Sequence, residues 1–139
     1  MRRVALLLVA AATLATGAAA DPVGDKLIAC APATFEAAVK CLDDGLPAAT
    51  RAQLVQPGGT ALAHHGLGTF LRNQWGLWKN GPLAVSMREM GFRSPDDMSG
   101  AILSAYAARH GGAPYDVRAA AAASTNNGRE AADRERQSK

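Results

Sequence analysis

The sequence has few of the residues that carry metal or redox chemistry. Its 139 residues include two cysteines and three histidines. They form no C-x-x-C and no H-E-x-x-H motif, no acidic calcium loop is present, and no histidine lies at metal-ligand spacing from either cysteine. We therefore predict no bound metal, no cofactor and no redox pair.

Strand patterns and long hydrophobic runs are also missing. No stretch alternates polar and β-branched residues, which predicts an all-α protein. The apolar run at residues 4–14 is shorter than the ~20 residues that span a bilayer. It follows Arg2 and Arg3 and precedes small residues at 18–20, the pattern of a secretory signal peptide. We predict that residues 1–20 are removed, that no membrane span remains, and that the protein is periplasmic or secreted.

The sequence also lacks a large excess of charge of either sign. The formal net charge is +3, and it falls to near +1 when Arg2 and Arg3 leave with the signal peptide. The remaining acids and bases are dispersed along the chain until its last stretch. We therefore expect no nucleic-acid partner.

The two cysteines, Cys30 and Cys41, belong to a chain that we expect in an oxidising compartment. A disulfide between them is the favoured interpretation, because it needs no further ligand and suits a small secreted domain. Such a small loop contributes about 2–3 kcal/mol to the free energy of unfolding.

The chain without its signal peptide is long enough for one domain with a modest core. Residues 21–33 are polar and contain proline, which predicts an N-terminal arm before a helical domain at 34–111. Residues 112–139 are an alanine run followed by a polar stretch that has no apolar face. We predict that this tail is disordered or weakly helical.

About five short helices are predicted in the domain. Thr34 is an N-cap residue that precedes an apolar stripe of Phe35, Val39 and Leu42, and Gly45 ends this helix. Ser94 is the other strong N-cap, since a proline and two acids follow it. The predicted helices cover approximately 34–45, 47–55, 62–77, 83–90 and 94–111, with apolar faces at Leu67, Leu71, Trp75 and Trp78 on the third and at Met98, Ile102, Ala105 and Tyr106 on the fifth.

Two motifs, "RNQWGLW" on the third helix and "PDDMS" on the fifth, occur together over residues 34–110. In this combination the sequence resembles a small bacterial domain family of unknown function. The resemblance implies a shared fold and a set of signature positions but no reaction. These positions include Gly68, Trp75, Pro95, Asp96, Met98 and Ser99.

The third helix carries most of the candidate binding residues. On a regular helix His65 and Arg72 share one face with Thr69 and Gly76, beside the tryptophan face. Tryptophan next to arginine and asparagine is typical of sites that stack a sugar ring or bind a peptide. The candidate binding residues are His65, Arg72, Asn73, Trp78 and Asp97.

A structural interpretation competes with binding at most of these positions. Trp75 is expected in the core, and Arg72 is expected to pair with Asp96 or Asp97, because polar groups near a core need partners. Asn73 is expected to bond the backbone of the turn at 80–81. The two aspartates are explained by their place in the first turn of a helix.

Adjacent aspartates on a helix diverge by about 100°, so Asp96 and Asp97 cannot work as the paired carboxylates of a glycosidase. No serine has a histidine and an acid arranged around it, and we name no catalytic residue. We predict a non-enzymatic interaction module whose partner is a protein or a cell-envelope component. The alternative is a small hydrolase that uses His65, Arg72 and Asp97 in a cleft between the third and fifth helices. An exposed apolar patch at Trp78 and Phe92 would favour a protein partner.

Overall fold

The computed structural model describes residues 21–138, and helices are the only regular elements in this part of the chain. The predicted signal peptide lies outside the described residues. The helices are α1 (Pro22–Cys30), α2 (Phe35–Gly45), α3 (Ala48–Leu54), α4 (Gly59–Ala63), α5 (Thr69–Gln74), α6 (Pro82–Met90), α7 (Pro95–Gly111) and α8 (Val117–Gln137), with a π-helical turn, η1 (His64–Gly68), before α5. The all-α fold class is confirmed. None of these helices is both long enough and apolar enough to cross a membrane.

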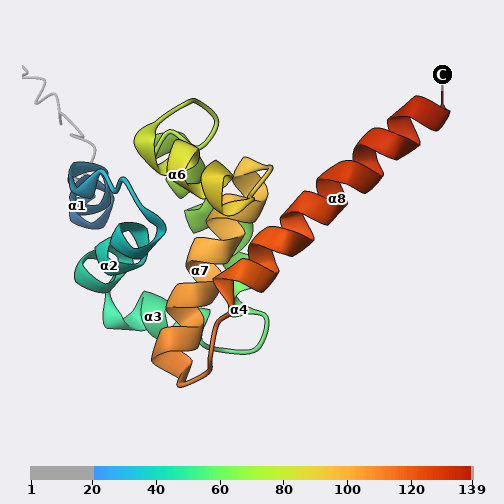
Figure 1. Ribbon diagram of the computed structural model, residues 1–139. Coiled ribbons are helices and arrows are strands. Elements are labelled where there is room, and N and C mark those ends of the chain that lie inside the picture. Colours follow the sequence, from blue (N-terminus) through green and yellow to red (C-terminus); the bar gives the residue numbers. More distant parts are fainter. Residues whose placement is uncertain (1–20, 139) are drawn as a thin grey trace, which may run out of the picture.

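Helix α7 is the centre of the domain (Figure 1) and packs against α2, α3, α4, η1, α5, α6 and α8. Its predicted stripe of Met98, Ile102, Ala105 and Tyr106 is buried throughout, so this prediction is confirmed. Leu42, Leu71, Leu83 and Met87 from the surrounding helices are fully buried in the same core. Burial of apolar side chains on one central helix is what holds these short helices together, because isolated helices of this length are marginal in water.

The two predicted N-caps are both present. Thr34 Oγ1 accepts a hydrogen bond from Ala37 N at 3.2 Å, and Ser94 Oγ accepts one from Asp97 N at 3.0 Å. The helix that Thr34 starts buries Phe35, Val39 and Leu42, as its stripe predicts. These starts were predictable because an N-cap acts on amides only two or three residues away.

The expected N-terminal arm contains a helix, which the sequence did not predict. Asp21 caps α1 by accepting a hydrogen bond from Val23 N at 3.2 Å, and Pro22 occupies the first turn. Leu27 is 1% exposed and anchors the helix in the core. Tertiary packing at Leu27 therefore stabilises a helix that is too short to form alone.

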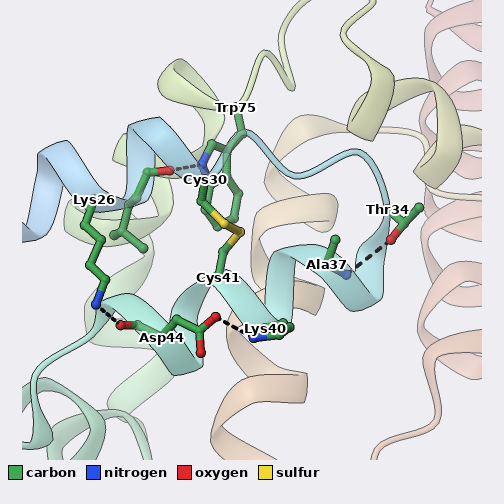
Figure 2. The surroundings of a disulfide bond; sticks show 9 residues. Lys26, Cys30, Thr34, Ala37, Lys40, Cys41, Asp44 and Trp75 are labelled. Atoms are coloured by element: carbon green, nitrogen blue, oxygen red, sulfur yellow. Dashed lines mark hydrogen bonds and ion pairs between the residues drawn. A yellow bond between two sulfur atoms is a disulfide. The ribbon is translucent and has the colours of Figure 1, made fainter.

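The predicted disulfide between Cys30 and Cys41 is present, with the two Cα atoms 6.1 Å apart. It joins the end of α1 to the buried face of α2 (Figure 2). On the same side, Trp75 Nε1 donates a 2.9 Å hydrogen bond to the carbonyl oxygen of Leu27. A covalent bond and a buried hydrogen bond therefore hold α1 against the domain. Trp75 is 5% exposed and belongs to the core, as the structural interpretation expected.

The predicted third helix is split into α4, η1 and α5. The π-helical turn contains two glycines, Gly66 and Gly68, which weaken regular helix formation. Arg72 Nη2 also donates to the carbonyl oxygen of His64 at 3.4 Å, so a side chain competes for this backbone acceptor. Together with α1 and α8, this division explains why residues 21–138 contain more helices than the five predicted.

Residues 117–137 of the expected tail form one helix, α8. Asp116 Oδ1 caps it by accepting from the amides of Arg118 and Ala119, both at 3.0 Å. Ala121 and Ser124 are buried against the domain, and residues 126–138 are exposed. The C-terminal half of α8 projects away from the other helices (Figure 1).

Candidate functional site

The first candidate residue, Arg72 on α5, is buried, and both of its terminal nitrogens have partners in the interior. Its side chain is 6% exposed. Nη1 donates to Ser99 Oγ at 2.8 Å and lies 3.3 Å from Asp96 Oδ1, while Nη2 donates to Thr69 Oγ1 at 2.8 Å. This geometry agrees with the network interpretation and selects Asp96, not Asp97, as the carboxylate. Nε is buried, and no atom of residues 21–138 forms a hydrogen bond with it.

Gly68 in η1 makes room for this guanidinium. A Cβ atom at position 68 would lie 3.2 Å from Arg72 Nη1 and 3.7 Å from Leu103 Cδ1. The first distance is tighter than ordinary van der Waals contact, so any side chain would push against Arg72. The glycine of the sequence signature is therefore explained by the arginine four residues later.

The N-terminus of α7 supplies the other half of the network. Ser99 is fully buried, and its hydroxyl accepts from Arg72 and donates to the carbonyl oxygen of Asp96 at 3.1 Å. The Asp96 side chain is 51% exposed and lies 3.3 Å from His64 Nε2 as well as from Arg72. Pro95 and Met98 are structural: Pro95 opens the helix, and Met98 is 1% exposed in the core.

Asp97 takes part in a separate contact with α8. Its Oδ2 accepts a 2.6 Å hydrogen bond from Ser124 Oγ, and the same hydroxyl accepts from Arg93 N at 2.9 Å. Thr125 Oγ1 next to it donates to the carbonyl oxygen of Gly91 at 2.7 Å. Asp97 is therefore a docking point for the C-terminal helix and does not meet Arg72.

A depression of about 400 Å³ lies where η1, α7 and α8 meet, and its polar lining comes from His64, Asp96, Asp97, Tyr115, Ser124 and Asn127. Burial raises the pKa of the Tyr115 phenol, which stacks on Phe35 with ring centroids 6.4 Å apart. Phe92 also lines this depression and is 1% exposed. An exposed apolar patch at Trp78 and Phe92, which would have favoured a protein partner, is therefore not present at Phe92.

Sequence reasoning chose His65, whereas the depression is lined by His64. His65 is exposed, and its ring lies edge-to-face against that of His64 with centroids 5.2 Å apart. On a regular helix, His65 falls on the face of Arg72 because seven residues make nearly two turns. The π-helical turn adds backbone to one turn and shifts this phase, so His64 approaches Asp96 instead.

Trp78 lies outside the core. The helix face that was predicted to contain it ends at Gln74, and the chain turns at Gly76, whose φ is +68°. Leu77 enters the core with 1% exposure, and Trp78 remains 58% exposed. The prediction that Trp78 shares the apolar face is therefore wrong, because that face assumed an uninterrupted helix.

Asn73 is exposed, and its side chain meets Trp78 instead of the turn backbone. Trp78 Nε1 donates to Asn73 Oδ1 at 3.1 Å. The turn is joined to α6 by Arg88 Nη2, which donates to Asn80 Oδ1 at 2.8 Å. The interpretation of Asn73 as a turn-bonding residue is therefore wrong: it holds the indole of an exposed tryptophan.

A second, more apolar groove of about 530 Å³ lies between α3 and α4, and its apolar lining includes Leu54, Pro57, Leu62, Ala63 and Leu67. Leu62 is 84% exposed at this groove. No cluster of three or more histidine, cysteine or acidic side chains that would hold a metal ion occurs within residues 21–138.

The fold and this interior network define a small, disulfide-bonded helical domain whose signature residues build the contact between α5 and α7. The chain belongs to the family described as "Domain of unknown function (DUF6794)", whose model matches residues 31–110. The match begins at Ala31, directly after α1, and ends in the C-terminal turn of α7, so α1 and α8 lie outside it. No curated protein and no solved structure is significantly similar to the chain.

Proposed function

We propose that this domain is a non-enzymatic binding module, periplasmic or secreted, whose partner is a protein or a cell-envelope component. The observation that supports this proposal most directly is Trp78, the largest exposed apolar side chain of the described chain, at 58% exposure. Exposed tryptophans contribute more to binding than most residue types, because they bury a large area at little cost in side-chain entropy.

The surroundings of Trp78 favour a binding role over accidental exposure. Its indole N–H is already bonded to Asn73, so burying the ring against a partner leaves no donor unsatisfied. Gly76, with φ of +68°, fixes the turn that presents the ring. The side chain is thus held in place before a partner arrives, which reduces the entropy lost on binding.

The positions of the candidate catalytic groups support binding over hydrolysis. Arg72 is buried in its network, and Asp97 is bonded to Ser124. The Ser99 hydroxyl, which lies nearest to the Arg72–Asp96 pair, is fully buried and already donates to a carbonyl oxygen. Arg72 and Asp97, which the hydrolase alternative needs in one cleft, therefore belong to two separate contacts. The Ser99 hydroxyl, the candidate nucleophile nearest to Arg72, is not accessible to a substrate.

The proposed localisation has two supports. Residues 1–20 have the composition of a secretory signal peptide, and the chain has no free cysteine among the residues that the structure describes. A structural disulfide is typical of proteins that mature outside the reducing cytosol.

Photo-crosslinking at Lys79, which is exposed beside Trp78, tests the proposal. A photoreactive amino acid at this position, with Trp78 intact, is expected to form a discrete adduct in intact cells. The adduct should disappear in the Trp78→Ala background. A probe at Glu36, exposed on α2, is the matched control for non-specific capture.

Trp78→Ala should retain the wild-type circular dichroism spectrum and melting temperature, since the side chain is mostly exposed. Identical adducts with and without Trp78, or the same adducts from Glu36, would rule out a binding surface at this tryptophan.

A further inference from the structure

Three arginines from two separate segments line one surface groove beside α8. Arg93 belongs to the connection between α6 and α7, and Arg129 and Arg136 are two turns apart on α8. The groove has a volume of about 360 Å³, and its remaining lining is small: Thr125, Gly128 and Ala132. Because these residues are small, they leave open space in the groove that the arginines line.

Hydrogen bonds and packing fix the two sides of this groove relative to each other. The backbone amide of Arg93 donates to Ser124 Oγ at 2.9 Å. The stem of Arg93 also packs over Gly128, where an added Cβ would lie 3.6 Å from its Cβ and Cγ atoms. Arg93 is therefore held on the same face of α8 that carries Arg129 and Arg136.

The positive charge in the groove is only partly neutralised. Neither the Arg93 nor the Arg129 guanidinium makes a hydrogen bond or an ion pair within residues 21–138. Arg136 pairs with Asp133 at 3.1 Å on its own helix, and both side chains are more than half exposed. Gathering like charges is unfavourable without a counter-charge, so the groove offers a ready site for an anion.

We propose that this groove binds a phosphate group carried by a larger molecule. Guanidinium groups donate paired hydrogen bonds that match the oxygens of a phosphate, and two unpaired arginines with a third beside them suit a doubly charged tetrahedral group. The groove is open to solvent along the projecting half of α8, which leaves room for the rest of the ligand. A soluble phosphate ester and a phospholipid headgroup present the same chemistry. The groove lining does not include Trp78, and none of the observations that support this site rests on the binding role proposed for that tryptophan.

Calorimetric titration of the disulfide-bonded chain with inorganic phosphate tests the site at low ionic strength, where surface charges are least screened. Sedimentation with phosphatidylcholine vesicles, with and without phosphatidic acid, forms the second arm. Arg129→Gln and Arg93→Gln should each weaken binding about tenfold, as expected for loss of a charge-assisted contact. Arg134→Gln is the control: it removes the same charge from the same stretch of α8, outside the groove lining.

Arg93 lies outside α8, so weaker binding by Arg93→Gln cannot result from unfolding of α8. For Arg129→Gln and Arg134→Gln, circular dichroism checks that α8 remains helical. Saturable binding to phosphate alone would identify a soluble ligand, and binding only to phosphatidic acid vesicles would identify a lipid headgroup. Equal weakening by all three variants would show general charge attraction and overturn the proposal. Absence of saturable binding in both arms would overturn it as well.

Discussion

Arg72 Nη1 donates a 2.8 Å hydrogen bond to Ser99 Oγ, and this buried contact joins α5 to α7. The two residues come from the two halves of the sequence signature, "RNQWGLW" and "PDDMS". The signature residues therefore form a contact between α5 and α7, and the polar ones act mainly as interior partners of the Arg72 guanidinium.

Replacement of Arg72 by alanine should lower the free energy of unfolding by about 2–4 kcal/mol, because one buried and two partly buried hydrogen bonds are lost and a cavity remains. Asp96→Asn should cost less than about 1 kcal/mol, since the Asp96 side chain is 51% exposed and its charge stays hydrated. Urea unfolding of both variants measures the difference. Equal losses would mean that the ion pair with Asp96, and not the hydrogen bonds to Ser99 and Thr69, holds the contact.

Gly68→Ala should destabilise the domain by about 1–2 kcal/mol, because the new methyl group crowds the Arg72 guanidinium. Gly66→Ala is the matched control in the same π-helical turn, where nothing lies within 4 Å of the added atom. It should be neutral or stabilising by up to about 1 kcal/mol. The melting temperature of Gly68→Ala should therefore be lower than that of Gly66→Ala. Similar destabilisation in both variants would mean that the substitutions act through the backbone of η1 and not through Arg72.

Ser124→Ala should loosen α8 from the domain. The substitution removes the hydrogen bond to Asp97 and the acceptor of the Arg93 amide, while few apolar side chains of α8 are buried to compensate. Hydrogen exchange should accelerate across residues 117–125 and remain unchanged in α2 and α7. Asn126→Ala, at an exposed neighbouring position, should leave exchange as it is. Unchanged hydrogen exchange in Ser124→Ala would mean that other residues of α8 hold the helix against the domain.

Tyr115 predicts how stability responds to alkaline pH. Burial raises its pKa above the ordinary value of about 10, because the phenolate is less well solvated in the folded state. Below that ordinary value the phenol is protonated in both the folded and the unfolded state, and its contribution to the free energy of unfolding is fully present. As pH rises further, the unfolded chain ionises first and stability is lost until the folded-state pKa is passed.

Denaturant unfolding from neutral pH to above pH 10 should show this loss in the wild type and less of it in Tyr115→Phe. The difference in absorbance at alkaline pH between the two proteins should titrate above the ordinary tyrosine value. A difference that titrates at or below that value would contradict burial of the phenol.

The parts of the fold that were predictable depend on local chemistry. Thr34 and Ser94 start helices through hydrogen bonds to amides three residues away, so their sequence pattern is sufficient. The disulfide was predictable because two cysteines leave one pairing. Helix α1 was not predictable, since its stability comes from Leu27 and from Trp75, which is 48 residues away.

The candidate site was only partly predictable for a related reason. The partnership of Arg72 with the first turn of α7 follows from their opposite charges, and the structure selects Asp96. The choice between His64 and His65 depends on a π-helical turn that no periodicity indicates. The docking of α8 uses Ser124 and Thr125, small polar residues that carry no amphipathic signal.

The two tryptophans of the chain have opposite environments, although only three positions separate them. Trp75 is 5% exposed and bonded to the carbonyl oxygen of Leu27, whereas Trp78 is 58% exposed. The domain therefore contains two optical reporters. Emission from the enclosed indole follows the attachment of α1 and the disulfide, and quenching of the open indole by acrylamide follows the arrival of a partner, so both events can be observed without a label.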